Sequence, residues 1–314
     1  MPDVSIALGG GGVKGIVHVG VIRRLQELGI SIKAIAGTSV GGIVGAVAAK
    51  GFSPDDIEKH ILQMNQNELF RFSFSSSPSV LDLSGVASVL VDMLGDSTFE
   101  DLEIPFACTA VDLKTDQEVI ISSGLLLDAV LGTIAIPGVF PPKELGNALL
   151  VDGSILDPVP VALARWLAPT LPVIAVVLSP TMEGWTHMPS PRIEDVSNLP
   201  QQILDTFSKL KFAQAMNIFT HSIDISSRML TELRLQIDKP EVIIRPQIDQ
   251  YSILAKVDTE EVIRLGELAA DEAIDEINRA LDWPKTITRK FRKISAPAKM
   301  LDTTIQEDGQ DSDE

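Results

Sequence analysis

The stretch Ile32-Lys33-Ala34-Ile35-Ala36-Gly37-Thr38-Ser39-Val40-Gly41 decides the fold. Its first five residues are typical of a short strand, and the small apolar residues 42–49 that follow predict a helix. Between them, residues 37–41 match G-x-S-x-G, a sharp strand-to-helix turn that exposes a nucleophilic serine. Gly37 and Gly41 give the backbone the freedom that such a turn needs. The pattern predicts Ser39 as a nucleophile, and simple helix capping by the same serine is the alternative.

The residues before this turn predict a parallel sheet. Residues 4–8 read as a strand, residues 9–15 as a glycine-rich loop, and apolar spacing over 15–28 predicts a helix. A strand–helix–strand–helix order indicates parallel strands with helices on both faces of the sheet. Because the carboxyl ends of parallel strands meet at one edge, we expect the loop to lie beside Ser39. Its N–H groups then form an oxyanion hole, for which the candidate donors are Gly10, Gly11 and Gly12.

The rest of the chain continues the α/β pattern. Residues 124–142 are apolar but carry Asp128 and Pro137, so they predict a buried pocket wall and not a membrane span. Residues 200–236 predict one long helix with an apolar side. Further strands are expected at 106–111, 119–122, 148–151, 173–178 and 242–244, and further helices near 54, from 84, at 125–131, at 159–167 and from Thr259 to about 282.

Composition narrows the classes of function. The chain has 314 residues, 45% of them hydrophobic, with a mean hydropathy of +0.21 and a net charge of −17. This acidity argues against a nucleic-acid partner, which needs a basic footprint. A single cysteine, Cys108, forms no internal disulfide and indicates no metal cluster. Without a signal-like N-terminus, the expected location is cytoplasmic.

A candidate base follows the strand at 148–151. Asp152 begins a turn in the sequence Val151-Asp152-Gly153, and a carboxylate there has the chemistry to take a proton from Ser39. The alternative is an ordinary turn aspartate, because Asp-Gly is a common turn dipeptide.

Together these motifs resemble those of the patatin-like phospholipase family. The family pairs a G-G-G-x-[KR]-G loop with a G-x-S-x-G elbow and a D-G-[GA] motif, which match residues 10–15, 37–41 and 152–154. The blocks at 109–113 and 135–142 also look like the family, and the resemblance covers residues 1–180. Two departures stand out: Ser154 replaces the usual Gly or Ala, and Gly132-Thr133 replaces a common Ala-Ser pair.

The resemblance implies both a fold and a reaction. The fold is a three-layer α/β/α sandwich with a mostly parallel central sheet. The reaction is hydrolysis of lipid acyl esters, of the phospholipase A or lysophospholipase type, through an acyl-enzyme, with no metal or cofactor. Lys14 could lie near a phosphate head group, but a solvated lysine at the start of the helix is the favoured interpretation. The implied site residues are Ser39 and Asp152 as catalytic dyad, Gly10, Gly11 and Gly12 as oxyanion hole, and Gly15, Gly37, Gly41 and Gly153 as supporting motif positions.

Three other readings stay open. The spacing Gly10-x-Gly12-x-x-Gly15 matches a dinucleotide-binding loop, although that reading expects an acidic residue at the end of the second strand. A second possibility is a lipid-binding protein that carries the same motifs but has no catalytic activity. A Ser-His-Asp triad would use His187 or His221, both of which follow Asp152 in the chain.

The C-terminal residues differ in composition from the rest. We expect residues 1–284 to form the hydrolase domain and residues 285–314 to be a basic segment followed by an acidic, disordered tail. The basic cluster suggests peripheral contact with anionic lipid, and a solvated helix end is the favoured alternative. This basic cluster consists of Lys285, Arg289, Lys290, Arg292 and Lys293.

The sequence leaves the oligomeric state open.

Overall fold

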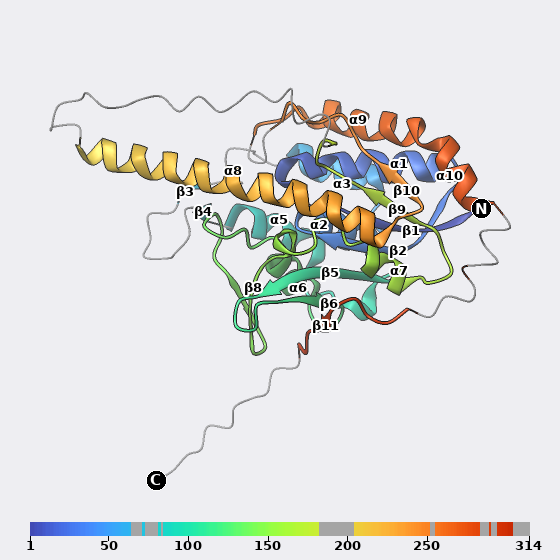
Figure 1. Cartoon of the computed structure of the whole chain (residues 1–314), viewed down its shortest axis with the longest axis horizontal. Coiled ribbons are helices and arrows are strands. Elements are labelled where there is room, and N and C mark those ends of the chain that lie inside the picture. Colours follow the sequence, from blue (N-terminus) through green and yellow to red (C-terminus); the bar gives the residue numbers. More distant parts are fainter. Residues whose placement is uncertain are drawn as a thin grey trace, which may run out of the picture.

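A central β-sheet organises the molecule. The computed structural model describes residues 1–63, 71–72, 81–82, 84–181, 204–251, 255–282, 289 and 294–303. Within these residues the main sheet runs in the order β10-β9-β1-β2-β5-β6-β11, and β7 and β8 join it beside β5 (Figure 1). The strands are β1 (Asp3–Leu8), β2 (Ser31–Thr38), β5 (Phe106–Asp112), β6 (Gln117–Ile121), β7 (Lys143–Leu145), β8 (Ala148–Asp152), β9 (Val173–Val176), β10 (Val242–Ile244) and β11 (Lys299–Met300).

The strand directions confirm a mostly parallel sheet. The five consecutive strands β10, β9, β1, β2 and β5 run parallel to one another. Strand β5 then pairs antiparallel with both β6 and β8, and β7 forms an antiparallel pair with β8. A separate short pair, β3 (Arg71–Phe72) and β4 (Leu81–Asp82), lies outside the main sheet.

Helices cover both faces of the sheet. In β1, the alternate residues Val4, Ile6 and Leu8 join the larger core with α1, α2, α6 and α9, whereas Ala7 joins a second core with α7. This alternation confirms the three-layer α/β/α arrangement. The helices are α1 (Val17–Glu27), α2 (Val40–Ala49), α3 (Pro54–Gln63), α5 (Ser84–Leu94), α6 (Leu126–Thr133), α7 (Val161–Leu167), α8 (Leu204–Asp238), α9 (Thr259–Glu272) and α10 (Ile274–Leu281), with short 3₁₀ turns η1 (Gly12–Ile16), η2 (Phe99–Asp101) and η3 (Gly153–Ile155).

Helices α1 and α9, which cover the larger core, pack with their backbones in close contact. A Cβ at Gly20 of α1 would overlap the Ile263 carbonyl of α9, and one at Gly266 of α9 would overlap the Val17 carbonyl of α1. The two backbones therefore touch at glycines. This contact anchors α1, which follows the glycine-rich loop directly.

The long helix α8 lies along the molecule, and its N-terminal end projects past the other helices (Figure 1). Its residue Leu235 packs into the second core, so the C-terminal part of α8 shares that face of the sheet with α7. No helix in the described residues is both long and apolar enough to cross a membrane.

Several local predictions need correction. The helix expected over 15–28 begins as the 3₁₀ turn η1. The single helix expected from Thr259 to about 282 is two helices, α9 and α10, and α9 is capped by Asp258, whose carboxylate accepts the Glu261 N–H at 3.1 Å. The basic segment is not simply exposed, because the Arg289 side chain is 2% exposed and donates to the Ala280 carbonyl at 2.6 Å. Residues 285, 290, 292 and 293 and the tail from 304 lie outside the described residues.

The predicted domain boundary at 284 remains a prediction. Residues Lys299 and Met300 beyond it form β11, which pairs in parallel with Val119 and Ile120 of β6. The main sheet therefore takes in one strand from the segment that the sequence assigned to a separate region.

Candidate active site

Two strands meet end to end along one side of β5. Strand β2 ends at Thr38, which pairs with Thr109, and the antiparallel β8 ends at Asp152, which pairs with Ala110. Because Thr109 and Ala110 are consecutive, the ends of β2 and β8 face each other from opposite directions. The pairing thus brings together Ser39 and Asp152, which are 113 positions apart in the chain.

Ser39 occupies the sharp turn between β2 and α2. Its φ of 56° and ψ of −129° are unusual for a residue with a side chain, and such backbone strain is common at functional sites. The Ser39 N–H donates to Thr133 Oγ1 at 2.9 Å, and Thr133 Oγ1 donates to the Thr109 carbonyl at 2.6 Å. Thr133, one of the departures from the family pattern, therefore tethers the strained turn to β5.

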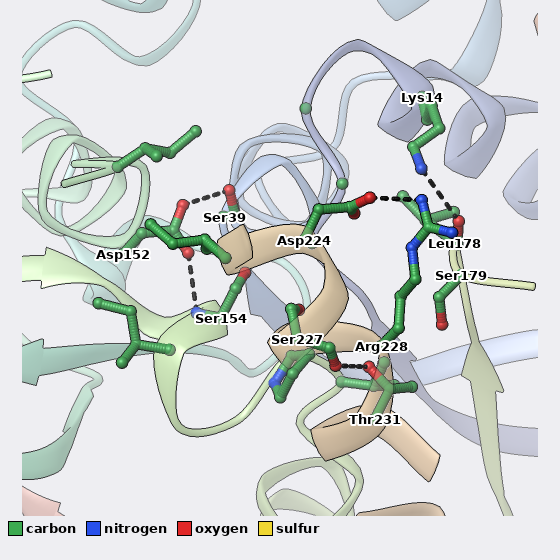
Figure 2. Close-up of a pocket in the computed structure, with 18 of the residues that line it drawn as sticks. Lys14, Ser39, Asp152, Ser154, Leu178, Ser179, Asp224, Ser227, Arg228 and Thr231 are labelled. Atoms are coloured by element: carbon green, nitrogen blue, oxygen red, sulfur yellow. Dashed lines mark hydrogen bonds and ion pairs between the residues drawn. The ribbon is translucent and has the colours of Figure 1, made fainter. Parts of the chain in front are cut away.

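Asp152 is a buried carboxylate in direct contact with the serine. Its Oδ2 accepts the Ser39 Oγ hydrogen bond at 2.5 Å, and its Oδ1 accepts the Ser154 N–H at 2.8 Å (Figure 2). Burial raises the pKa of Asp152, while the hydrogen bonds from Ser39 and Ser154 oppose the rise. A carboxylate with raised proton affinity, bonded to a hydroxyl, is suited to accept that hydroxyl's proton.

The glycine-rich loop lies against this pair. A Cβ at Gly10 would overlap Ser154 Oγ and stand 3.1 Å from Ser39 Cβ, so the close approach requires glycine. The Gly10 N–H, however, donates to the Pro158 carbonyl at 3.0 Å, so it is less available as an oxyanion donor than the sequence predicts. Within the described residues the N–H groups of Gly11 and Gly12 have no main-chain partner, so they are the remaining candidates.

The four supporting glycines lie where elements touch. A Cβ would overlap Val40 at Gly15, the Gly41 backbone at Gly37, the Leu8 carbonyl at Gly41 and Thr109 at Gly153. Each of these contacts packs the loop, the elbow or the Asp152 turn against a neighbouring element. Gly15 and Gly41 let the loop approach the elbow, and Gly153 lets the Asp152 turn approach β5.

A pocket opens beside the dyad. Its walls come from the glycine-rich loop, from the segments that follow α6, β8 and β9, and from one face of α8. Ile136 and Pro137 bear out the expected pocket wall within 124–142. The α8 residues were not foreseen, although their spacing of three and four positions places them on one helical face: Ile223, Asp224, Ser227, Arg228 and Thr231.

Lys14 also lines this pocket. The side chain is buried, with the residue 4% exposed, and Nζ lies 3.4 Å from the Leu178 carbonyl. Burial lowers the pKa of Lys14, and the nearby Asp224 carboxylate opposes the change. The expectation of a solvated lysine is therefore wrong.

The two histidines whose side chains the structure describes, His18 and His60, make no hydrogen bond with Ser39 or Asp152. His18 is fully buried, its Nε2 lies 2.8 Å from the Gly9 carbonyl, and burial lowers its pKa to about 4. A neutral Nε2–H there supports the loop backbone. His60 lies on α3, whereas His187 and the side chain of His221 lie outside the described residues.

Comparison with known proteins agrees with the geometry. A patatin-like phospholipase family model matches residues 6–165. An uncharacterised NTE family protein of Mycobacterium bovis is 38% identical over 163 residues, covering 51% of this chain and 45% of that protein. Lysophospholipase NTE1 of Debaryomyces hansenii is 27% identical over 337 residues, covering 98% of this chain and 20% of that protein. The chain thus spans less than half the length of these relatives.

A solved structure shares the fold. VipD from Legionella pneumophila superposes with a TM-score of 0.53 at 14% identity, covering 89% of this chain and 67% of that chain. With the family model extending over half of the sequence and all three of its motifs gathered at one pocket, the chain belongs to the patatin-like phospholipase family.

Proposed function

We propose that this chain hydrolyses acyl esters of lipids, of the phospholipase A or lysophospholipase type, through an acyl-enzyme on Ser39. The observation that carries the proposal is the 2.5 Å hydrogen bond from Ser39 Oγ to Asp152 Oδ2 beside the glycine-rich loop. The family, and the lysophospholipase named among its relatives, support a lipid substrate. The apolar residues of the pocket, including Ile136, Val159 and Leu178, suit an acyl chain.

The first half of the reaction forms the acyl-enzyme. Ser39 Oγ attacks the carbonyl carbon of the ester while its proton passes to Asp152 Oδ2. The N–H groups of Gly11 and Gly12 stabilise the oxyanion of the tetrahedral intermediate. As the intermediate collapses, the ester C–O bond breaks and the leaving alkoxide takes the proton from Asp152, so the carboxylate is restored.

The second half releases the acid. A water molecule attacks the acyl carbon while Asp152 accepts its proton, and the same N–H groups stabilise the second oxyanion. Breaking the bond to Ser39 Oγ returns the proton to the serine and frees the fatty acid. Asp152 acts directly, without a histidine between it and the serine.

A fluorophosphonate probe together with ester turnover tests the proposal. The wild-type chain should be labelled at Ser39 alone and should hydrolyse a short-chain lysophospholipid, whereas Ser39→Ala should lose both properties. Ser53→Ala, which removes an exposed serine hydroxyl at the start of α3, is the matched control and should retain both. Labelling at another residue, or full turnover by Ser39→Ala, would sink the assignment.

The same experiment separates the other readings. A folded wild type that binds lysophospholipid without labelling or turnover would be a non-catalytic lipid-binding protein. Thermal stabilisation by a dinucleotide, with no labelling, would revive the nucleotide-binding reading of the glycine-rich loop.

A further inference from the structure

A second serine hydroxyl lies beside the dyad. Ser154 follows the turn that carries Asp152, and it lines the pocket next to Asp152 and Ser39 (Figure 2). The family motif usually has Gly or Ala at this position, so the hydroxyl distinguishes this chain from the motif. The Ser154 N–H donates to Asp152 Oδ1 at 2.8 Å, whereas the proposed reaction gives the Ser154 hydroxyl no role.

The Ser154 hydroxyl is held between the glycine-rich loop and the dyad. A single carbon added to Gly10 would overlap Ser154 Oγ and would also stand 3.1 Å from Ser39 Cβ, so the two serine side chains flank the same small space. The hydroxyl is also near enough to the Asp152 carboxylate to favour its charged form, and it thereby lowers the pKa of Asp152 against the effect of burial. Ser154 Oγ therefore lies close to both members of the dyad, at the wall of the pocket.

The chemistry of ester cleavage limits where the departing oxygen can lie. This oxygen is bonded to the carbon that Ser39 Oγ attacks, and it takes up the proton that Asp152 has received, so it must come within hydrogen-bond reach of Asp152. The carbonyl oxygen lies toward the N–H groups of Gly11 and Gly12, where it becomes the oxyanion. The departing oxygen is thus left with the pocket side of the dyad, which is the side that Ser154 lines.

We propose that Ser154 is a catalytic residue whose hydroxyl donates a hydrogen bond to the departing oxygen. When the C–O bond of the tetrahedral intermediate breaks, its electron pair goes to this oxygen, which receives a proton from Asp152 and a hydrogen bond from Ser154 Oγ. Ser154 neither gains nor loses a proton. In the second half of the reaction the attacking water takes the same place, so its oxygen accepts the same hydrogen bond while its proton passes to Asp152. The inference rests on the proposed function and adds a third side chain at the reacting atoms.

The proposal predicts an effect that depends on the leaving group. An alkoxide develops a localised negative charge as it departs, whereas p-nitrophenolate spreads the charge over its ring and needs little help. The substrates are hexanoylglycerol and p-nitrophenyl hexanoate, which share an acyl chain, and the measured quantity is the ratio of the first kcat/KM to the second. Because kcat/KM reports the steps up to the acyl-enzyme, release of the acid does not enter the ratio. Ser154→Ala should lower the ratio by roughly tenfold or more, because one hydrogen bond to a charged oxygen is lost.

Two further variants sharpen the test. Ser154→Gly also lacks the hydroxyl and keeps the N–H that binds Asp152, so it should lower the ratio as much as Ser154→Ala does. Both variants should still be labelled at Ser39 by the fluorophosphonate, whose fluoride is a good leaving group, which would show that the dyad is intact. Ser53→Ala, which removes an exposed serine hydroxyl, is the matched control and should leave the ratio unchanged.

Four results would overturn the inference. Equal losses on both esters in Ser154→Ala mean that the side chain only supports the shape of the site. An unchanged ratio means that Asp152 alone assists the departing oxygen. A lower ratio in only one of the two Ser154 variants means that packing against Gly10, and not the hydroxyl, sets the ratio. A wild type that cleaves only the p-nitrophenyl ester gives no assistance to an alkoxide at all. Failure of the proposed function looks different, because the wild type then hydrolyses neither ester.

Discussion

Asp152 and Asp157 are two buried carboxyls five positions apart, and their surroundings differ. Asp152 is 3% exposed and Asp157 is fully buried, and burial raises the pKa of both. Asp152 accepts hydrogen bonds from Ser39 and Ser154, which favour its charged form. The nearest cation of Asp157, Arg234 Nε, lies 3.9 Å from its Oδ1. Both carboxyls have a raised pKa, so a raised pKa alone does not identify the catalytic base. The hydrogen bond with the Ser39 hydroxyl distinguishes Asp152 from Asp157.

The neighbours of Asp157 explain why its pKa rises well above the usual range. After burial, the largest contribution is the charge of Glu118, and Asp238 adds to it, while Arg234 opposes both. Arg234 also donates to Glu118 Oε2 at 2.5 Å and to the Leu156 carbonyl at 3.1 Å. Arg165 also acts on Asp238, so burial and the charge of Glu118 are the main causes of the raised pKa of Asp157.

The sharpest way to break this comparison is to replace each carboxyl by an amide. Asp152→Asn cannot accept the Ser39 proton, so its kcat should fall by at least about 10³-fold. Asp157→Asn replaces a carboxyl that, within the described residues, makes no hydrogen bond with Ser39 by an amide of the same shape and should keep kcat within about tenfold of the wild type. Ester turnover by the two folded variants measures this. Equal losses would mean that burial, and not contact with Ser39, is what matters.

A smaller loss is expected from crowding the dyad. In Gly10→Ala the added Cβ would overlap Ser154 Oγ and press on Ser39, and a displacement near the reacting atoms can cost about 10²-fold in kcat. Adding Ser154→Gly removes the overlapping hydroxyl and should restore part of the rate. Ser154→Gly alone is the control. No recovery in the double variant would show that the overlap with Ser154 is not the cause.

The pH dependence of hydrolysis should follow Asp152 alone. The base works only when ionised, and burial raises its pKa, so kcat/KM should rise with pH and fall about tenfold per unit below that pKa. The turning point should lie above the ordinary aspartate value of about 3.9. Asp157→Asn should show the same profile. A shifted profile in that variant would mean that Asp157 and the dyad titrate together.

The part of the site near these aspartates was largely predictable from the sequence. An elbow, a glycine-rich loop and an Asp-Gly turn each impose local backbone geometry, and short motifs report such geometry well. The direction of β8 was not predictable, because it depends on how the chain returns after α6. The burial of Lys14 was also not predictable. The Asp224–Arg228 pair beside it comes from α8, and oppositely charged residues four positions apart are common on solvent-exposed helices.

The raised pKa of Asp157 should also affect stability, by about 1.4 kcal/mol per unit of pKa shift. The pKa of Asp157 is raised in the folded chain, so its stabilising contribution is complete below the unfolded value and is lost as pH rises through the folded one. Asp157→Asn does not titrate there and should gain on the wild type in free energy of unfolding between about pH 5 and about pH 8. Urea unfolding at both pH values measures it. Parallel changes in the two proteins would mean that Glu118 or Asp238 carries the proton instead.

The smallest effects are expected from the two histidines that follow Asp152 in the chain. In a Ser-His-Asp triad an imidazole stands between the hydroxyl and the carboxylate, whereas here Ser39 Oγ donates directly to Asp152 Oδ2 at 2.5 Å, which leaves no space for a ring. His187→Ala and His221→Ala should therefore each keep kcat/KM within about tenfold of the wild type, since loss of a true triad member costs about 10⁴-fold or more. Turnover of the same short-chain ester measures both, with Ser39→Ala as the inactive reference. If either folded variant is as inactive as Ser39→Ala, the hydrogen bond between Ser39 and Asp152 belongs to a resting arrangement, and a histidine acts as the base during turnover.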